Sequence, residues 1–161
     1  MQFSVRRAVP GDSATLFSLI VELSRFEKLE HTVTGSAREL DRHLFGSESR
    51  ASALLAESAA GEALGFALFF STFSTFLTRP GLYLEDLFVV ESARGRGIGR
   101  GLLREVARIA KAMGAGRLEW TVLDWNTKAI DFYRANGATV MPDWRVCRVT
   151  GDGLDRLIGD D

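Results

Sequence analysis

Cysteine and histidine are scarce in this sequence, and each scarcity excludes a class of protein. The single cysteine, Cys147, permits no internal disulfide, so we expect a reducing, cytoplasmic location. The two histidines, His31 and His43, are isolated and lack the spacing of metal ligands, so we predict no metal site. Cys147 alternates with its neighbours Val146 and Arg148, a pattern that predicts a packed thiol in a strand rather than a nucleophile.

Long hydrophobic runs and an excess of one charge are missing too. The longest apolar runs, such as residues 63–70, are far too short to cross a bilayer, and residues 1–10 do not resemble a signal peptide. We therefore expect no membrane partner. The net charge is −1, which argues against a nucleic acid partner. A chain of 161 residues that is 46% hydrophobic is expected to form one domain, residues 1–161, with its own core.

Hydrophobic periodicity predicts a mixed α/β (α+β) domain. Seven strands are expected, at residues 3–6, 51–57, 63–73, 82–90, 117–123, 138–141 and 144–150. Four helices are expected, at residues 16–26, 36–44, 98–113 and 127–135. Three side chains are placed to cap helices: Asp12, Ser36 in a capping box with Glu39, and Asn126. The polar tail, residues 151–161, is expected to fray.

A glycine-rich turn lies between a buried strand and an amphipathic helix, at Arg94-Gly95-Arg96-Gly97-Ile98-Gly99. Such a turn directs backbone N–H groups and the positive end of a helix at one point, which suits a phosphate. The P-loop pattern is absent. The dinucleotide pattern Gly-x-Gly-x-x-Gly also fails, because its third glycine falls on Arg100 or Leu102. We predict a site for another pyrophosphate-bearing cofactor.

The string Arg-x-x-Gly-x-Gly at residues 94–99 resembles the pyrophosphate loop of the GNAT superfamily of N-acetyltransferases. Other segments resemble its diamine and thialysine acetyltransferase branch, and they are Leu82-Tyr83-Leu84-Glu85-Asp86-Leu87-Phe88-Val89, Leu123-Asp124-Trp125-Asn126 and Asp131-Phe132-Tyr133-Arg134-Ala135-Asn136-Gly137-Ala138. The pair Phe26-Glu27 also matches this branch. These motifs span about the second half of the chain and one helix of the first half.

The resemblance implies a fold, a co-substrate and an assembly. The fold is a mixed, mostly antiparallel sheet of about seven strands flanked by about four helices, with a splayed acyl-CoA groove. The co-substrate is acetyl-CoA, and a homodimer is expected. The implied cofactor contacts are Leu87, Phe88, Val89, Arg94, Gly95, Arg96, Gly97, Ile98, Gly99, Arg100, Asn126 and Tyr133. Asn126 is also a helix cap, and Arg100 is also compatible with a solvated helix face.

Acetyl transfer to an amine requires a neutral nucleophile, whereas only roughly one alkyl amine in a thousand is neutral at pH 7. Glu85 is our candidate base, acting directly or through water, and a buried ion pair is the structural alternative for Glu85-Asp86. In a regular strand these two side chains would face opposite ways, but the resemblance implies a bulge that redirects one of them. The resemblance also assigns Tyr133 as the acid that protonates the leaving thiolate, against a purely packed tyrosine.

The acceptor is expected to be a small cationic primary amine of diamine, polyamine or lysine-analogue type. Its predicted contacts are acidic or aromatic: Phe26, Glu27, Glu85 and Asp86. The phenylalanine at residue 26 lacks the hydroxyl that some polyamine-using relatives carry there. Two alternatives stay open. One is an acetyltransferase acting on a protein amine or an amine-bearing antibiotic, and the other is a non-catalytic acyl-CoA-binding module.

Overall fold

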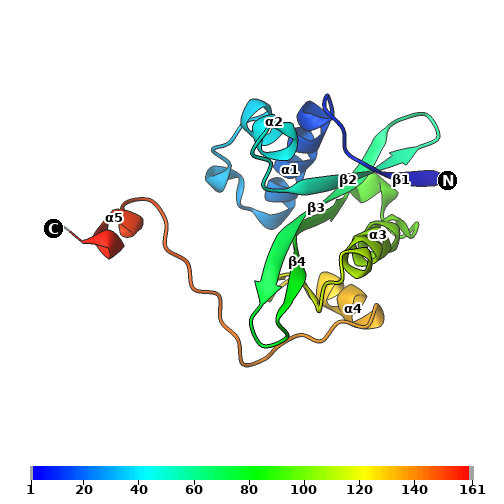
Figure 1. The fold of residues 1–161 in the computed structure, drawn as a ribbon. Helices are drawn as coiled ribbons and strands as arrows, with labels where there is room; N and C mark the ends of the chain where they lie inside the picture. The colour runs from blue at the N-terminus through cyan, green and yellow to red at the C-terminus, as the bar shows by residue number, and fades with distance from the viewer. Residues whose placement is uncertain (1, 160–161) are drawn as a thin grey trace. The chain divides into compact units, whose positions relative to one another are not determined.

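A computed structural model describes residues 2–159, which divide into two compact units between Thr121 and Val122. In chain order the elements are β1 (Phe3–Arg7), α1 (Ser13–Glu27), a 3₁₀ turn η1 (Glu30–Thr32), α2 (Ala37–Phe45), β2 (Ser52–Ser58), β3 (Ala63–Ser74), β4 (Arg79–Val89), a 3₁₀ turn η2 (Glu91–Ala93), α3 (Ile98–Ala112), β5 (Leu118–Glu119), α4 (Thr127–Ala135) and α5 (Asp152–Ile158) (Figure 1).

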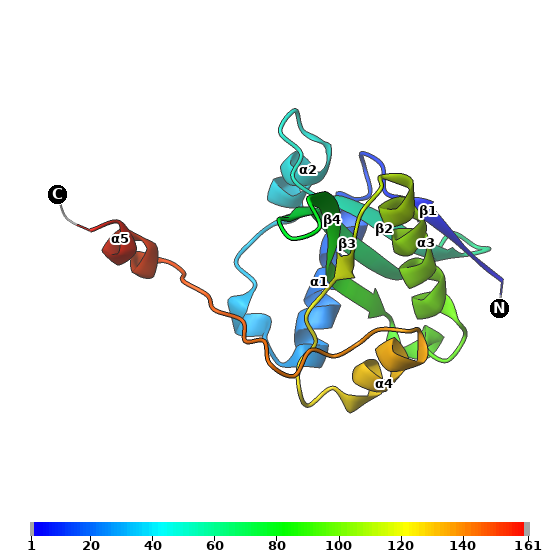
Figure 2. The ribbon, with the colours of Figure 1, turned by 60° about the horizontal axis from the view of Figure 1, so that its bottom comes forward.

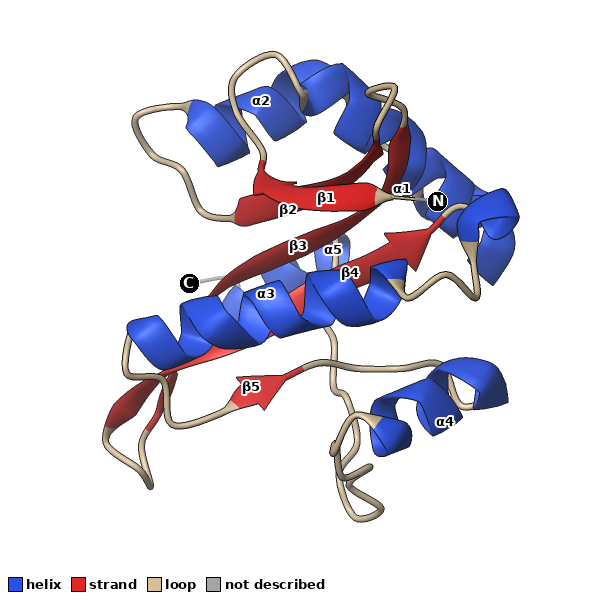
Figure 3. Cartoon of the chain, turned by 90° about the vertical axis from the view of Figure 1, so that its right-hand side faces the viewer, coloured by secondary structure: helices blue, strands red, loops and turns tan. Residues whose placement is uncertain are grey.

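The first unit is built on one sheet with the strand order β1-β2-β3-β4-β5. The pairs β1-β2, β2-β3 and β3-β4 are antiparallel, and β5 runs parallel to β4 (Figure 3). Strands β3 and β4 are long and pair along most of their length, from Gly65 opposite Val89 to Ser74 opposite Arg79. The predicted hairpin of β2 and β3 is confirmed.

Helices cover both faces of this sheet (Figure 2). One face packs against α1 and α2, where Leu16, Leu19 and Leu44 join Phe66 and Phe88 in a buried apolar cluster. Full burial of such side chains stabilises the fold by about 1.5–3 kcal/mol each. The apolar side chains Leu16 and Leu19 therefore form the surface that packs α1 against β3 and β4.

The opposite face packs against α3, whose buried residues recur at helical spacing: Ile98, Leu102, Leu103, Val106 and Ala110. Gly101 lies where α3 approaches β1, because a methyl group at this position would come within 2.9 Å of the Phe3 ring. The close approach holds the first turn of α3, and with it the glycine-rich turn, against the sheet.

Two of the three predicted caps are confirmed. The Ser36 hydroxyl accepts from the Glu39 backbone N–H at 3.2 Å, which is one half of a capping box. In place of the other half, the Glu39 carboxylate accepts from the Ser36 hydroxyl at 2.9 Å. The Asn126 side chain accepts from the Ala129 N–H at 3.2 Å. Asp12 occupies the N-cap of α1 without capping it. Its carboxylate accepts from Arg6 at 2.7 Å, and this hydrogen bond lowers the pKa of Asp12.

The expected fold class is confirmed, but the numbers of strands and helices are wrong. Among residues 2–159 the sheet has five strands, not about seven, and there are five α-helices, not about four. The strand expected at residues 117–123 is shortened to Leu118–Glu119. The tail expected to fray contains α5 over residues 152–158.

The strands predicted at residues 138–141 and 144–150 are not formed in the second unit. Trp144 and Val146 are 73% and 68% exposed, and Cys147, expected to be a packed thiol, is exposed as well. A period-two pattern specifies which side chains share a face, but a strand also needs a partner edge to satisfy its N–H and C=O groups. No described residue after Thr121 belongs to the sheet.

Gly65 is a position in the sheet where the fold excludes a side chain. A methyl group there would lie 2.4 Å from the Phe88 carbonyl oxygen and 3.1 Å from Val89 Cα, both backbone atoms that cannot rotate away. We expect Gly65→Ala to lower the free energy of unfolding by about 1–3 kcal/mol, as overpacking does. Urea denaturation followed by circular dichroism measures this.

Gly35→Ala is the matched control, since an added methyl group meets no atom within 4 Å there. This control is expected to stay within about 0.5 kcal/mol of the wild type. Equal urea midpoints for Gly65→Ala and the wild type would contradict the close approach of β3 and β4.

Candidate functional site

The candidate site is centred on an irregularity in β4 at Glu85. Along β3, Leu68 pairs with Asp86 and the next residue, Phe69, pairs with Leu84, so Glu85 has no partner residue in β3. The bulge that the family resemblance implied is thereby confirmed. An extra residue in one strand changes which face its neighbours occupy. Leu84 and Asp86 consequently project to opposite faces of the sheet, although they are two residues apart.

The bulge directs Asp86 toward the face covered by α1. Asp86 pairs with Leu68, which belongs to the apolar cluster beneath α1, and cross-strand partners share a face. Burial, followed by the negative charges of Glu85 and Glu27, raises the pKa of Asp86 to about 7. Burial also raises the pKa of Glu27. The predicted acceptor carboxylates from α1 and β4 are therefore close enough to influence one another.

Among residues 2–159 no Lys, Arg or His forms an ion pair with Glu85 or Asp86. The structural alternative, in which this acidic pair serves a buried ion pair, is therefore not realised there. A cation placed beside a half-buried carboxyl group lowers the free energy needed to ionise it, because the cation stabilises the charged form. This part of the first unit is chemically suited to a cationic group.

Phe26, at the C-terminal end of α1, is linked to the glycine-rich turn through Arg94. The Arg94 guanidinium lies 4.5 Å from the centroid of the Phe26 ring and 5.7 Å from that of Phe88. Its Nε donates to the Val89 carbonyl oxygen at 3.0 Å. A cation–π contact at an exposed site contributes about 0.5–1 kcal/mol. This contact was not predictable from local sequence patterns, because α1 and the turn are far apart along the chain.

The glycine-rich turn has the backbone that an anion site needs. Gly95 and Gly97 have φ angles of +76° and +82°, in the left-handed region that glycine adopts without strain. Gly97 is the N-cap of α3, and no side chain caps the helix there. The positive end of the α3 dipole is therefore available to a negatively charged group. Arg96 and Arg100 are exposed on the same turn.

The end of β4 offers main-chain groups along one edge. Leu87, Phe88 and Val89 pair with β3 on one side, whereas β5 pairs with β4 only at Leu82 and Tyr83. Within residues 2–159 no strand pairs with Leu84–Val89 on the β5 side. An unpaired edge presents N–H and C=O groups to any ligand that can bond to them. The splayed acyl-CoA groove expected from the resemblance stays a prediction, which this open edge of β4 would serve.

Two predicted site residues, Asn126 and Tyr133, belong to the second unit. Asn126 caps α4, as described above. Tyr133 lies on α4, is buried with 9% of its surface exposed, and its ring centroid is 5.3 Å from that of Phe132. The remaining predicted site residues all lie in the first unit.

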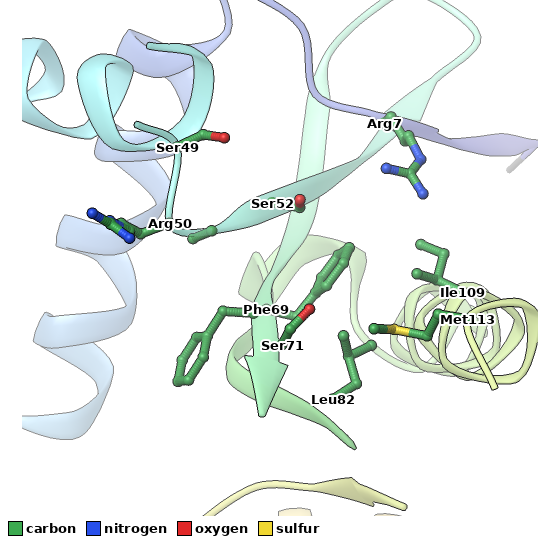
Figure 4. Close-up of a pocket in the computed structure, with 11 residues that line it drawn as sticks. Arg7, Ser49, Arg50, Ser52, Phe69, Ser71, Leu82, Ile109 and Met113 are labelled. Atoms are coloured by element: carbon green, nitrogen blue, oxygen red, sulfur yellow. The ribbon is translucent and has the colours of Figure 1, made fainter. Parts of the chain in front are cut away.

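A surface pocket of about 230 Å³ in the first unit is shown in Figure 4, and none of the predicted site residues lines it. Arg7 of β1, Phe69 and Leu82 of the sheet, and Ile109 and Met113 near the end of α3 contribute to its lining. The glycine-rich turn adjoins the N-terminal end of α3. The α3 residues that line this pocket thus lie at the other end of the helix from the glycine-rich turn.

Neither a metal cluster nor a membrane span accompanies this site within the described residues. No group of three or more His, Cys, Asp or Glu side chains among residues 2–159 is arranged to hold a metal ion. No helix in the same range has both the length and the apolar character needed to cross a membrane.

Comparison with known proteins is consistent with this geometry. Residues 19–138 match the sequence model of the Acetyltransferase (GNAT) family. The chain is 36% identical, over 96% of both chains, to thialysine N-epsilon-acetyltransferase of Bos taurus. It is also 48% identical over 93 residues to L-ornithine N5-acetyltransferase NATA1 of Arabidopsis thaliana, a match covering 58% of this chain and 41% of that protein.

Among solved structures, an integron cassette protein from the mobile metagenome of V. cholerae has a similar fold. The TM-score is 0.82 with 29% sequence identity, and the match covers 99% of each chain. The similarity therefore extends over both compact units.

The raised pKa of Asp86 predicts how stability depends on pH. A carboxyl whose pKa is about 7 in the folded state, against 3.8 ordinarily, holds its proton more tightly when folded. Stability therefore falls as pH rises through this range, by up to about 1.4 kcal/mol per pH unit from this group. We expect Asp86→Asn to remove this loss and to be more stable than the wild type at pH 8 but not at pH 4.

Urea denaturation at several pH values between 4 and 8 measures the two curves. Glu48→Gln, which changes an exposed carboxylate between α2 and β2, is the control and is expected to follow the wild-type curve. A constant difference between Asp86→Asn and the wild type across this range would contradict the assignment.

Proposed function

The chain belongs to the GNAT family of acetyltransferases, and from this premise we propose that it transfers an acetyl group from acetyl-CoA to a primary amine of a small cationic molecule. The observation that carries the proposal is the bulge at Glu85. It brings Asp86 toward Glu27 on one face of β4, beside the strand edge and the glycine-rich turn that suit the acyl donor. Negative charge for an amine and an anion site for the donor then belong to the same part of the fold.

The choice of acceptor is supported by the charge of the site and by the relatives. Asp86 and Glu27 both favour a cationic ligand, since a nearby positive charge lowers the cost of ionising them. The relatives reported above are named for thialysine and for ornithine, each a small molecule with a primary amine on a flexible chain. We propose an acceptor of this type, with a diamine or polyamine as the further members of the class.

The acyl donor is proposed to be held by three sets of groups. The main chain of Leu87–Val89 bonds the donor's extended arm along the open edge of β4. The backbone N–H groups of Gly95–Arg100, together with Arg94, bind its pyrophosphate. Asn126 and Tyr133 supply the contacts from the second unit. When bound, acetyl-CoA supplies a thioester carbonyl carbon that an amine can attack.

The proposed mechanism is direct attack, with no acyl-enzyme. Glu85 takes a proton from the bound ammonium, directly or through water, and frees the nitrogen lone pair. The nitrogen forms a bond to the carbonyl carbon, and the C–S bond then breaks with its electron pair left on sulfur. Tyr133 gives its hydroxyl proton to that sulfur, and the amine's second proton leaves to solvent. General acid–base help of this kind contributes about 10²–10⁴-fold.

The assembly and the domain organisation are proposed as well. A homodimer is proposed from the family resemblance and is supported by exposed aromatic rings near the β3–β4 turn, where Phe73 and Phe76 are 59% and 96% exposed. Phe66 and Phe69 of the same segment are in the core and are not available to a partner. A single functional domain over residues 1–161 stays a prediction.

A thiol-release assay with acetyl-CoA tests the proposed function. The small amines are thialysine, ornithine, lysine, putrescine and spermidine. An aminoglycoside and a lysine-containing peptide are assayed as alternative acceptors. We expect the highest kcat/KM with one of the small amines. Preference for the aminoglycoside or the peptide would favour the alternative acceptors. Tight CoA binding without thiol release from any amine would contradict the proposed reaction.

Tyr133→Phe tests the proposed acid. The substitution removes only the hydroxyl group, so we expect kcat to fall by an order of magnitude or more while CoA affinity stays nearly unchanged. Steady-state kinetics and calorimetric titration with CoA measure the two quantities. Phe132→Leu, a change at the neighbouring ring, is the control and is expected to have the smaller effect on kcat. An unaltered kcat in Tyr133→Phe would remove this residue from the mechanism.

A further inference from the structure

We propose that Arg94 couples the two ligands: an anion bound on the glycine-rich turn strengthens the binding of a cationic amine beside Phe26 and Glu27. This inference rests on the proposed function, because it takes the donor's pyrophosphate and the amine as the two ligands. It adds a role for one side chain that belongs to the turn but lies against the acceptor end of α1.

The position of the Arg94 side chain carries the proposal. Arg94 directly precedes Gly95, the first glycine of the turn, and follows η2. Its guanidinium nevertheless rests 4.5 Å from the Phe26 ring centroid and 5.7 Å from that of Phe88. The hydrogen bond from Nε to the Val89 carbonyl oxygen, at 3.0 Å, fixes its direction. One side chain therefore connects α1, the end of β4 and the turn.

The charge of Arg94 is not cancelled within the described part of the chain. No carboxylate among residues 2–159 forms an ion pair with Arg94. An arginine carries its positive charge at any physiological pH. A cationic amine that approaches Phe26 is attracted by Glu27 and Asp86 and is repelled by Arg94. While no anion is bound on the turn, the repulsion by Arg94 therefore offsets part of the attraction that the amine experiences.

A pyrophosphate on the turn changes this balance. Its negative charges lie next to Arg94 and offset the positive field that the amine experiences. The amine then binds more tightly, and by thermodynamic reciprocity the amine strengthens pyrophosphate binding by the same factor. The coupling favours enzyme that already holds its acyl donor when the amine arrives, so that the amine is captured where it can react.

Arg100 provides a comparison within the same turn. It is exposed in the first turn of α3 and makes no cation–π contact within residues 2–159. If both side chains only bound phosphate, removing the charge of Arg94 or of Arg100 would have the same effect on amine binding. Coupling requires the side chain that lies against Phe26, and this distinguishes the two residues.

Calorimetric titration of the amine, with and without saturating free CoA, tests the coupling. Free CoA lacks the acetyl group, so no turnover occurs. The amine is thialysine, ornithine or spermidine, whichever has the lowest KM in the acetylation assay. For the wild type we expect the amine Kd to fall about fivefold or more when CoA is bound.

Arg94→Gln removes the charge and keeps a side-chain N–H donor, so we expect its amine Kd to be nearly the same with and without CoA. Arg100→Gln is the matched control, which is expected to weaken CoA binding yet keep the wild-type ratio of amine Kd values. Equal ratios in Arg94→Gln and the wild type, or a wild-type ratio of one, would overturn the proposal.

A second variant covers the case in which Arg94→Gln no longer binds CoA. Phe26→Leu leaves Arg94 in the turn and removes the ring that holds it, so we expect a reduced ratio of amine Kd values. An unchanged ratio in this variant would then overturn the coupling. A protein that binds CoA and acetylates the amine without any coupling refutes only this inference. The absence of acetylation with every amine refutes the proposed function itself.

Discussion

The pairing of β3 with β4 is the constraint on which the candidate site depends. These strands pair closely enough at Gly65 and Val89 that no side chain fits, and one extra residue is accommodated at Glu85. Side chains of β4 before the bulge alternate between the two faces as in a regular strand. After the bulge each side chain lies on the opposite face from the one that unbroken alternation would give it. Asp86 consequently faces α1, and Phe88 joins the core there. One local irregularity thus decides which face of the sheet is acidic.

Features set by neighbouring residues were predictable from the sequence. The helix caps of Ser36 and Asn126 and the left-handed glycines of the turn all depend on groups a few residues apart. The Glu85 bulge was expected only from the resemblance to a family. Residue types alone would have placed Glu85 and Asp86 on opposite faces of a regular strand.

Features that depend on distant partners were not predictable. The pattern of residues 144–150 is that of a strand, but no edge of the sheet pairs with it. Asp12 is a residue type that often caps helices and stands at the N-cap position, yet its carboxylate accepts hydrogen bonds from Arg6 instead. The contact of Arg94 with Phe26 joins segments whose proximity is created by the packing of α1 on β4. In each case the deciding partner lies outside the window in which local patterns carry information.

The half-buried Asp86 has a further consequence for the energetics of ligand capture. With a pKa of about 7, this carboxyl is divided between its protonated and ionised forms in neutral solution. A cation that settles beside it selects the ionised form, so capture of the ligand is accompanied by release of a fraction of a proton. The carboxyl acts as a small proton reservoir. The apparent enthalpy of binding of the cationic ligand accordingly changes with the ionisation enthalpy of the buffer that receives the proton.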